Sequence, residues 1–354
     1  MEKILQPSTG VQNVAINQVA THNLRKGPFY HHVTYFVTVY KTALTAGFTS
    51  ATLQDALDLL EVRVNTTTRR SFLAIELEAI QGAYGANYLT TATDNLLNDG
   101  ITTQADTVNA TGATVQGPGG PVPANSTQRP TTFEFTIYFS EPSRNSYTAR
   151  RFFGLPTSWK TGKTVDIQIA LKVPNNAGIS SPIITAEEFI EFTTGPHLKS
   201  LANGQPDTTS PEVLPFVHFW RIPRDYAANV FSITDWGNVA GQLQQISVFG
   251  QNNDFLQSFK LKADNVVKRD TTKGRNDRLA QRYDWNQPVP TLPAPYNQPN
   301  VTHIALDVSD DVTDWLNFNA YKNVELAFQL SQAAAANKAV VAIVQAYDLY
   351  QLPA

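Results

Sequence analysis

The sequence contains no cysteine, which excludes disulfide cross-links, cysteine-ligated zinc, iron–sulfur clusters and thiol nucleophiles. Charged residues make up only 16% of the 354 residues, well below the roughly 25% that is usual in globular proteins. So few charges on so long a chain indicate that much of the surface faces something other than water. The formal net charge of -3 provides no overall field that would attract nucleic acid or acidic substrates.

Long apolar segments are also missing. The N-terminal stretch lacks the apolar core of roughly 7–15 residues that a signal peptide carries. The run Val340 to Val344 is far shorter than the roughly 20 residues needed to cross a bilayer. We therefore expect a chain that is not integral to a membrane. Asn-x-Ser/Thr sequons begin at Asn65, Asn109, Asn125 and Asn300. Without an export signal they are weak evidence for glycosylation.

Aromatic and β-branched residues are plentiful and alternate with polar ones. Aromatic residues make up 10% of the chain, with 19 Phe and 13 Tyr. The segment TTFEFTIYFSEP, residues 131–142, is typical of a half-buried strand because its apolar side chains fall on one face of an extended chain. Further strands are predicted at residues 29–42, 59–65, 71–80, 164–173 and 187–192. One short helix is predicted at residues 52–60, with Thr52 as its N-cap.

The pattern of the first half recurs in the second half. Without gaps inside each block, the apolar positions coincide when Leu59 is matched with Leu243, Phe135 with Ile304 and Val165 with Val324, among others. In both halves the largest insertion precedes the third matched block, at residues 81–130 and 264–300. Conserved order and spacing of several blocks indicate two copies of one β domain.

Each half offers about six to eight short strands with long loops and little helix, which favours a sandwich or jelly roll. The missing alternation of helices with strands argues against an α/β enzyme. The stretch from Gly195 to Pro215 is the best candidate linker. We predict an N-terminal arm at residues 1–28 and two domains, at residues 29–205 and 206–354.

The order of these blocks resembles the double jelly-roll major capsid proteins, and more particularly those of tectiviruses, the membrane-containing bacteriophages of the adenovirus-hexon lineage. The resemblance implies an all-β fold of two tandem eight-stranded jelly rolls with long loops and a few short helices. It also implies a homotrimer of pseudo-hexagonal outline, an icosahedral shell around an internal membrane, and contacts with minor capsid and penton proteins. The protein would then be made in the host cytoplasm and located in the virion.

Two groups of basic residues are candidates for contacts. The resemblance implies an N-terminal arm on the inner side of the shell, so Arg25 and Lys26 are candidate membrane-proximal residues, and deletion of residues 1–24 should leave trimers intact but impair the shell. A basic segment in the enlarged loop of the second repeat could neutralise phosphates or bond carboxylates across a subunit boundary. We expect the subunit contact, and no specific nucleic-acid binding, because the chain is nearly neutral. The candidate contact residues are Lys268, Arg269, Arg275, Arg278 and Arg282.

Residues that could carry catalysis show no matching pattern. No metal-binding spacing, Gly-x-Ser-x-Gly elbow or phosphate-binding loop occurs, so we predict no enzyme, no cofactor and no metal. The adjacent carboxylates Glu187 and Glu188 are expected at a solvated edge, and Asp314 is expected to cap a short helix rather than to bind calcium with Asp310 and Asp311. Ordinary hydrogen bonds in strands are expected for the histidines, which are His22, His31, His32, His197, His218 and His303.

Two other classes of function stay open at this point. A carbohydrate- or receptor-binding β-sandwich, such as a phage spike, would use exposed Trp and Tyr side chains on one cluster of loops. A jelly-roll enzyme of the cupin or glycosidase kind is the weakest reading because no ligand triad appears. The leading hypothesis is a structural protein whose mechanism is self-assembly.

Overall fold

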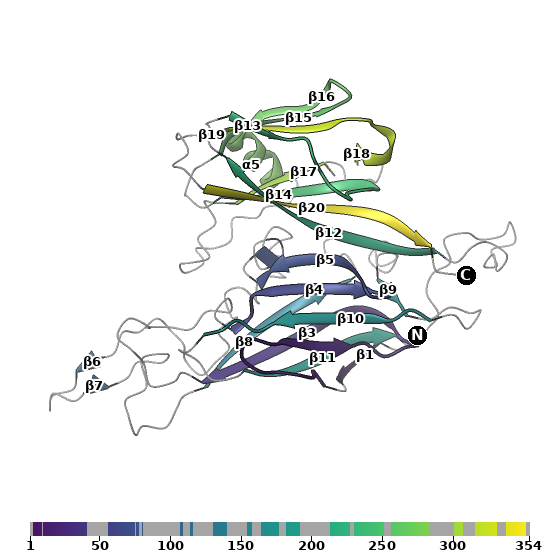
Figure 1. Cartoon of the computed structure of the whole chain (residues 1–354), viewed down its shortest axis with the longest axis vertical. Helices are drawn as coiled ribbons and strands as arrows, with labels where there is room; N and C mark the ends of the chain where they lie inside the picture. The colour runs from purple at the N-terminus through teal and green to yellow at the C-terminus, as the bar shows by residue number, and fades with distance from the viewer. Residues whose placement is uncertain are drawn as a thin grey trace, which may run out of the picture. The chain divides into compact units, whose positions relative to one another are not determined.

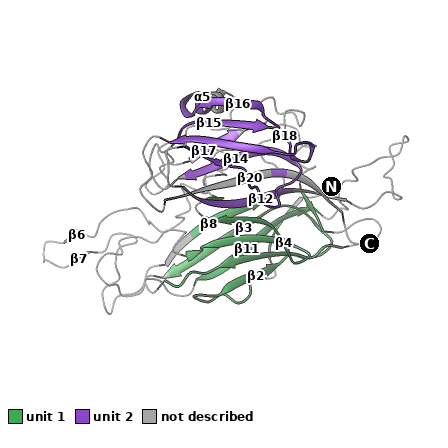
Figure 2. Ribbon diagram, turned by 45° about the horizontal axis from the view of Figure 1, so that its top comes forward, with its two compact units in different colours: residues 1–78, 89–141, 154–208 green, residues 79–88, 142–153, 209–354 purple. Residues whose placement is uncertain are grey.

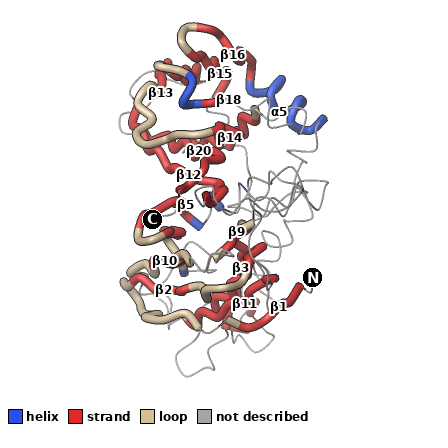
Figure 3. The backbone as a smooth tube through the Cα atoms, turned by 90° about the vertical axis from the view of Figure 1, so that its right-hand side faces the viewer, coloured by secondary structure: helices blue, strands red, loops and turns tan. Residues whose placement is uncertain are grey.

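In the computed structural model the chain divides into two compact units (Figures 1 and 2). The first contains residues 1–78, 89–141 and 154–208, and the second contains residues 79–88, 142–153 and 209–354. Strands make up most of the described chain, and α5 is its main helix (Figure 3). The structure describes residues 3–8, 10–40, 56–74, 76–77, 80, 107–108, 114–115, 130–139, 154–157, 164–176, 182–191, 213–226, 230–250, 256–282, 301–306, 316–330 and 338–351.

Two antiparallel sheets form the first unit. One sheet has the order β1 (Lys3–Pro7), β11 (Ile183–Glu191), β3 (Phe29–Tyr40) and β8 (Pro130–Tyr138). The other sheet has the order β2 (Val19–Asn23), β10 (Ile167–Lys172), β4 (Leu59–Val64) and β5 (Thr67–Leu73). Three shorter strands complete the described part, in which β9 pairs with β3 and β6 pairs with β7; they are β6 (Thr107–Val108), β7 (Thr114–Val115) and β9 (Leu155–Pro156).

Antiparallel strands in two sheets also form the second unit. One sheet has the order β12 (Val213–Tyr226), β20 (Lys338–Gln351), β14 (Gln242–Gly250) and β17 (Val301–Ala305). The other has the order β13 (Val230–Ile233), β19 (Val324–Leu330), β15 (Leu256–Ala263) and β16 (Val266–Thr272). The short β18 pairs with β14, and the remaining elements are α5 (Lys273–Arg282), β18 (Leu316–Asn317) and the 3₁₀ turn η4 (Phe318–Ala320).

Both units have the same strand connectivity. When the eight main strands of a unit are numbered in chain order, the sheets read 1-8-3-6 and 2-7-4-5 in the first unit and again in the second. The short strands β9 and β18 also agree, because each lies between the sixth and seventh main strands and pairs with the third. This connectivity is that of the jelly roll, so the chain is a tandem of two jelly rolls.

Alternating side chains build the core, as the sequence pattern predicts. Phe133, Phe135 and Ile137 on β8 are at most 1% exposed, whereas Glu134 and Tyr138 on the other face are half-buried. The core of the second unit likewise joins its two sheets, since residues of β14 and β17 pack in one cluster with residues of β15 and β19. Burial of these faces between two sheets is the main source of stability in a sandwich.

The hairpin between the fourth and fifth strands is repeated in fine detail. In the first unit Asn65 and Thr66 turn the chain with φ of 46° and 71°, and in the second unit Asp264 and Asn265 do so with φ of 46° and 67°. Two consecutive positive φ values are typical of a type I′ turn, whose twist matches that of the strands. Residues 59–73 and 258–272 therefore superpose strand for strand without a gap.

A β-bulge and an arginine opposite it also recur in these hairpins. The register shifts after Val62 in one hairpin and after Leu261 in the other, and the partners of these residues are Arg70 and Arg269. The Arg70 guanidinium lies 5.3 Å from the centre of the Phe139 ring, and it bonds a backbone carbonyl next to that ring. The arginine of each hairpin thus lies against an aromatic side chain of its own unit.

The turn residue Thr66 gives a first test of this geometry. A β-branched residue at φ of 71° is strained. We therefore expect Thr66→Gly to raise the free energy of unfolding by about 1 kcal/mol, as measured by thermal or urea unfolding. Thr68→Gly, at an exposed strand position of the same hairpin, is the matched control and should lower stability by about 0.5–1 kcal/mol. Equal effects of the two changes would contradict the turn assignment.

The prediction of an N-terminal arm at residues 1–28 is wrong where the structure describes this segment. β1 pairs with β11, and β2 pairs with β10, so the segment supplies the first two strands of the first jelly roll. Neither strand has the apolar alternation from which a strand is predicted in a sequence. Polar side-chain contacts attach both strands instead. The two compact units divide after Thr208, against a predicted boundary after residue 205.

Three segments differ from their predicted structure. The helix predicted at residues 52–60 overlaps β4, because Leu59 and Leu60 are strand. Residues 71–80 are strand only as far as Leu73; Ala74, Glu76, Leu77 and Ile80 are helical, and the Leu73 amide donates to the Glu76 carboxylate over 2.8 Å, which favours a helix start. The basic segment predicted as a loop is not one. It consists of β16 and α5, because the I′ turn at Asp264 starts a hairpin.

Candidate functional site

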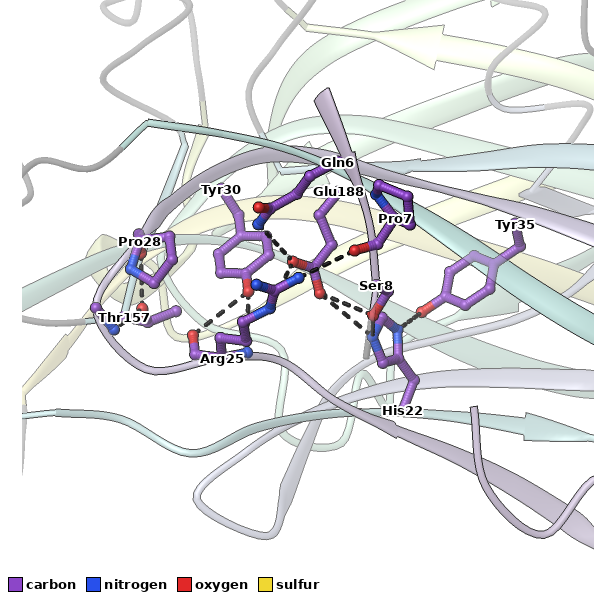
Figure 4. Close-up of polar contacts among 11 residues, drawn as sticks. Gln6, Pro7, Ser8, His22, Arg25, Pro28, Tyr30, Tyr35, Thr157 and Glu188 are labelled. Carbon is purple, nitrogen blue, oxygen red and sulfur yellow. Dashed lines mark hydrogen bonds and ion pairs between the residues drawn. The ribbon is translucent and has the colours of Figure 1, made fainter. Parts of the chain in front are cut away.

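A buried polar cluster in the first unit joins the N-terminal strands to the rest of the jelly roll (Figure 4). The inward face of β11 carries Ile184, Ala186, Glu188 and Ile190, so a carboxylate occupies a position where the alternation predicts an apolar residue. Glu188 is fully buried, as is His22 on β2. The prediction that Glu188 lies at a solvated edge is therefore wrong. β11 lies inside its sheet between β1 and β3.

The hydrogen bonds of the cluster run in one direction towards Glu188. Ser8 Oγ donates to Glu188 Oε1 over 2.9 Å and also contacts His22 Nε2. The other ring nitrogen of His22, Nδ1, lies 2.7 Å from the Tyr35 hydroxyl. These contacts are satisfied when Tyr35 donates to His22, His22 donates to Ser8 and Ser8 donates to the carboxylate. Because His22 and Tyr35 belong to different sheets, the chain of bonds connects the two layers of the sandwich.

Arg25 lies close to both Glu188 and β1. Its Nε is 3.4 Å from Glu188 Oε2, and its terminal NH2 group donates to the Pro7 carbonyl over 3.0 Å. The Arg25 amide donates to the Tyr30 hydroxyl over 2.9 Å. The guanidinium of Arg25 is therefore used inside the first unit. Lys26 forms an exposed ion pair with Asp166. The membrane-proximal role of Arg25 and Lys26 stays a prediction.

The surroundings of Glu188 favour its ionised form. Burial alone would raise the pKa of Glu188, but the hydrogen bonds from His22 and Ser8 and the charge of Arg25 together lower this pKa below the ordinary 4.5. The neighbouring phenols respond in the opposite direction. Burial, with a further effect of the Glu188 charge, raises the pKa of Tyr35 well above 10.0 and also raises that of Tyr30. The cluster therefore holds one stable negative charge between neutral hydroxyl groups.

This arrangement differs from a Ser-His-acid catalytic triad. In a triad the histidine accepts the serine proton, and the acid holds the other ring nitrogen. Here Ser8 donates to Glu188 directly, and the far nitrogen of His22 is held by Tyr35. The contacts suit a structural bridge rather than the activation of a nucleophile.

A second polar cluster lies in the second unit around His303 on β17. His303 Nδ1 is 2.9 Å from Ser247 Oγ and 3.2 Å from Gln245 Nε2. Asn276 on α5 donates to the His303 carbonyl over 2.8 Å and accepts from Arg269 over 2.8 Å. Burial, with the charge of Lys273, lowers the pKa of His303 from 6.5 to about 4, so the imidazole is neutral at neutral pH. The cluster connects α5, β16 and β17.

The predicted contact residues of the second unit divide into two groups. Arg269 is half-buried, and its guanidinium bonds Asn276 and lies 5.9 Å from the Phe259 ring centre, so it stabilises the unit itself. Lys268, Arg275 and Arg278 are exposed, and the Lys268 ammonium lies 4.9 Å from the Tyr321 ring centre. Arg282 is the last residue of α5. Their role in a subunit contact stays a prediction.

The described residues contain no group of three or more metal-binding side chains. His31 shares a hydrogen bond of 2.9 Å with Glu191, as expected for a strand histidine. The contact described for His218 is of another kind, because its ring stacks on Trp220 with ring centres 4.7 Å apart. His197 and the group Asp310, Asp311 and Asp314 lie outside the described residues. In the part of the chain that is described, no helix is long and apolar enough to cross a bilayer.

Comparison with known proteins finds likeness in structure but not in sequence. No family model matches the chain, and no curated protein matches it either. The major capsid protein P2 from Bacteriophage PM2 is similar in structure, with 12% identity, a TM-score of 0.59 and coverage of 98% of each chain. The STIV MCP, from Sulfolobus Turreted Icosahedral Virus, has 15% identity, a TM-score of 0.62 and coverage of 100% of this chain and 98% of that one.

A third similar structure is the PBCV-1 virus capsid, with 9% identity, a TM-score of 0.61 and coverage of 98% of this chain and 94% of that one. All three matches extend over both units of the chain. Together with the strand connectivity, they show a double jelly roll, the fold that the sequence resemblance implied.

Proposed function

We propose that this chain, a double jelly roll in connectivity and in its likeness to solved structures, is the major capsid protein of an icosahedral virus. The observation that carries the proposal is the likeness over at least 98% of the chain to three shell proteins of different viruses. The physical role is self-assembly without catalysis. The alternative of a receptor-binding spike is not favoured, because these matches are to shell proteins.

The duplicated connectivity supports assembly as a trimer. Two jelly rolls of identical connectivity in each chain make six similar domains in a trimer, so an approximately six-fold outline arises from exact three-fold symmetry alone. Such a unit can tile the flat faces of an icosahedral shell. The low content of charged residues, 16%, suits large contacts between copies.

The finer parts of the proposal concern location and partners. We propose that the trimers form the shell of a virion together with minor capsid and penton proteins, and that the shell surrounds a membrane. The exposed cations Lys268, Arg275 and Arg278 are proposed to bond carboxylates of a neighbouring copy. These statements rest on the resemblance in sequence pattern and on the exposure of the three side chains.

Purified protein provides the test of self-assembly. Sedimentation velocity at micromolar concentration is expected to give a species of three times the monomer mass. The triple change Lys268→Ala, Arg275→Ala, Arg278→Ala should weaken association, and the matched triple change of the paired Lys260, Lys262 and Lys273 to Ala should weaken it less, because ion pairs within the unit already use these lysines. A protein that stays monomeric at all concentrations would contradict the proposal.

A further inference from the structure

In the first strand of the first jelly roll, none of the side chains of residues 4–7 is fully buried. The side chains of residues 4–7 in β1 alternate between half-buried and exposed, and Leu5 is 59% exposed. The corresponding strand of the second unit, β12, has 14 residues and buries Val217 and Ile222. Since apolar burial is the main force that holds a strand in a sandwich, β1 needs another source of attachment.

The Glu188 carboxylate supplies this attachment. Four side-chain contacts reach it from residues 6–25, the segment that runs from the end of β1 to just past β2, and the Tyr30 hydroxyl on β3 also interacts with it. The distances to Glu188 oxygens are 3.4 Å from Gln6 Nε2, 2.9 Å from Ser8 Oγ, 3.5 Å from His22 Nε2 and 3.4 Å from Arg25 Nε. The fully buried carboxylate on β11 thus contacts side chains both before and after the connection between β1 and β2.

The contacts of the cluster depend on whether the Glu188 carboxylate is charged. His22 on β2 and Arg25 after β2 are the basic groups that face it, and Tyr30 and Tyr35 on β3 are the phenols. On its own strand, Glu187 points to the opposite face. A neutral carboxyl would no longer attract Arg25, which also holds the Pro7 carbonyl of β1.

We propose that Glu188 is a charge-dependent latch for the N-terminal strand. While the carboxylate is ionised, β1 is docked on β11. When it is neutral, residues 3–8 detach, and the remaining strands of the first jelly roll stay folded. The device would allow the chain to release its N-terminal strand without losing the rest of the fold. It does not depend on the proposed role in a capsid.

Acid is the condition that would open the latch. The pKa of Glu188 in the folded protein lies below the ordinary 4.5. Its contribution to stability is therefore complete above about pH 4.5 and is lost as the pH falls through the lowered value. The buried His303 titrates in a different window. Its pKa of about 4 means that the second unit loses stability as the pH falls from 6.5 towards 4. The decisive comparison is for this reason made at pH 7.

Glu188→Gln removes the charge at pH 7 and keeps the size of the side chain. Hydrogen exchange with peptide resolution should show that the protection of residues 4–8 falls about tenfold or more, while the protection of β3, β10 and β15 is unchanged. Glu191→Gln is the matched control, because Glu191 is equally buried on the same strand and its carboxylate bonds His31 of β3. It should leave residues 4–8 protected.

A reversible lock provides a second test on the protein with Glu188 intact. The chain has no cysteine, so Pro7→Cys with Glu187→Cys introduces one disulfide between directly opposed residues of β1 and β11. Acidification should lower the protection of residues 4–8 in the reduced protein before β3 and β10 lose theirs, and the oxidised protein should keep it. The comparison remains decisive even if Glu188→Gln fails to fold.

Several results would overturn the latch. Unchanged protection of residues 4–8 in Glu188→Gln would do so, and so would an equal loss in Glu191→Gln. Loss of protection throughout the first jelly roll in Glu188→Gln would mean that the carboxylate stabilises the whole unit. In the disulfide experiment, β1, β3 and β10 of the reduced protein could lose protection at the same pH. This result would also mean that the carboxylate stabilises the whole unit.

Discussion

Removal of residues 1–24 is expected to unfold the first jelly roll. The deletion takes away two of its eight main strands, β1 and β2, and the buried side chains of Ala20, His22 and Leu24. It also leaves Glu188 buried without Ser8 and His22, with Arg25 as its remaining cationic neighbour, and removal of a partner from a buried charge costs about 3–5 kcal/mol. Together, the loss of the two strands, of the buried side chains and of the partners of Glu188 is comparable to the total stability of a domain, roughly 5–15 kcal/mol. The expectation that this deletion leaves trimers intact and impairs only the shell is replaced by this one.

Hydrogen exchange measures the result of this deletion unit by unit. The truncated chain should lose protection in β3, β10 and β11, while β14, β15 and β19 of the second unit keep theirs. Deletion of Met1 and Glu2 alone is the control, because β1 begins at Lys3, and it should have little effect. A truncated protein with native protection in β3 and β11 would show that the N-terminal strands are dispensable.

Phe135→Ala is expected to be the most damaging single substitution among the residues of β8. Phe135 is fully buried and stacks on Tyr35 of the neighbouring strand, with ring centres 5.1 Å apart. Truncation of a buried Phe to Ala costs about 3–5 kcal/mol, because the transfer free energy is lost and a cavity remains. The measurement is the free energy of unfolding from urea denaturation of the first unit.

A matched control for Phe135 lies on the same strand. Tyr138 is half-buried on the opposite face of β8, and it should tolerate Tyr138→Ala with a loss of about 1–2 kcal/mol. If the two substitutions have equal effects, the inward face of β8 does not fill the core, and the assignment of the two faces is wrong.

The apolar strands of the fold could be predicted from the sequence because their faces alternate. The pattern predicts strands at β3, β4, β8 and β10 and at the second half of β11, and the residues of β8 that the pattern places inside are buried. Duplication could be predicted as well, since the order of several blocks recurs. The double jelly roll follows from these two observations and from no single motif.

The strand-by-strand alignment of the two halves could not be predicted in full. The pattern matches Leu59 with Leu243, which pairs the fourth strand of one unit with the third of the other, whereas the structural partner of β4 is β15. In the seventh strand the pattern matches Val165 with Val324. In the structure Ile167 pairs with Val64 and Val324 pairs with Ala263, and each of these partners directly precedes the turn of its hairpin, so the counterpart of Val324 is Ile167. A period of two residues leaves such shifts undetermined. The turn dipeptides Asn65-Thr66 and Asp264-Asn265 are the signal that could have set the register.

The polar cluster around Glu188 was not predicted, for a related reason. β1 and β2 lack apolar alternation, so their sequence reads as an irregular arm, and the carboxylate that receives their contacts lies about 160 residues or more later in the chain. Only the pairing of β1 with β11 brings Ser8 next to Glu188. A buried carboxylate in an otherwise apolar strand face was the one available hint.

Electron cryomicroscopy of the particles formed by this protein tests the central claim most directly. We expect closed icosahedral shells whose repeating unit contains three chains, with each chain contributing two barrels of the same connectivity to a six-barrel outline. Strand β1 should be visible on the edge of the first barrel at neutral pH. A density map with one barrel per chain, or particles in which the chain forms isolated spikes on a shell made of another protein, would contradict it.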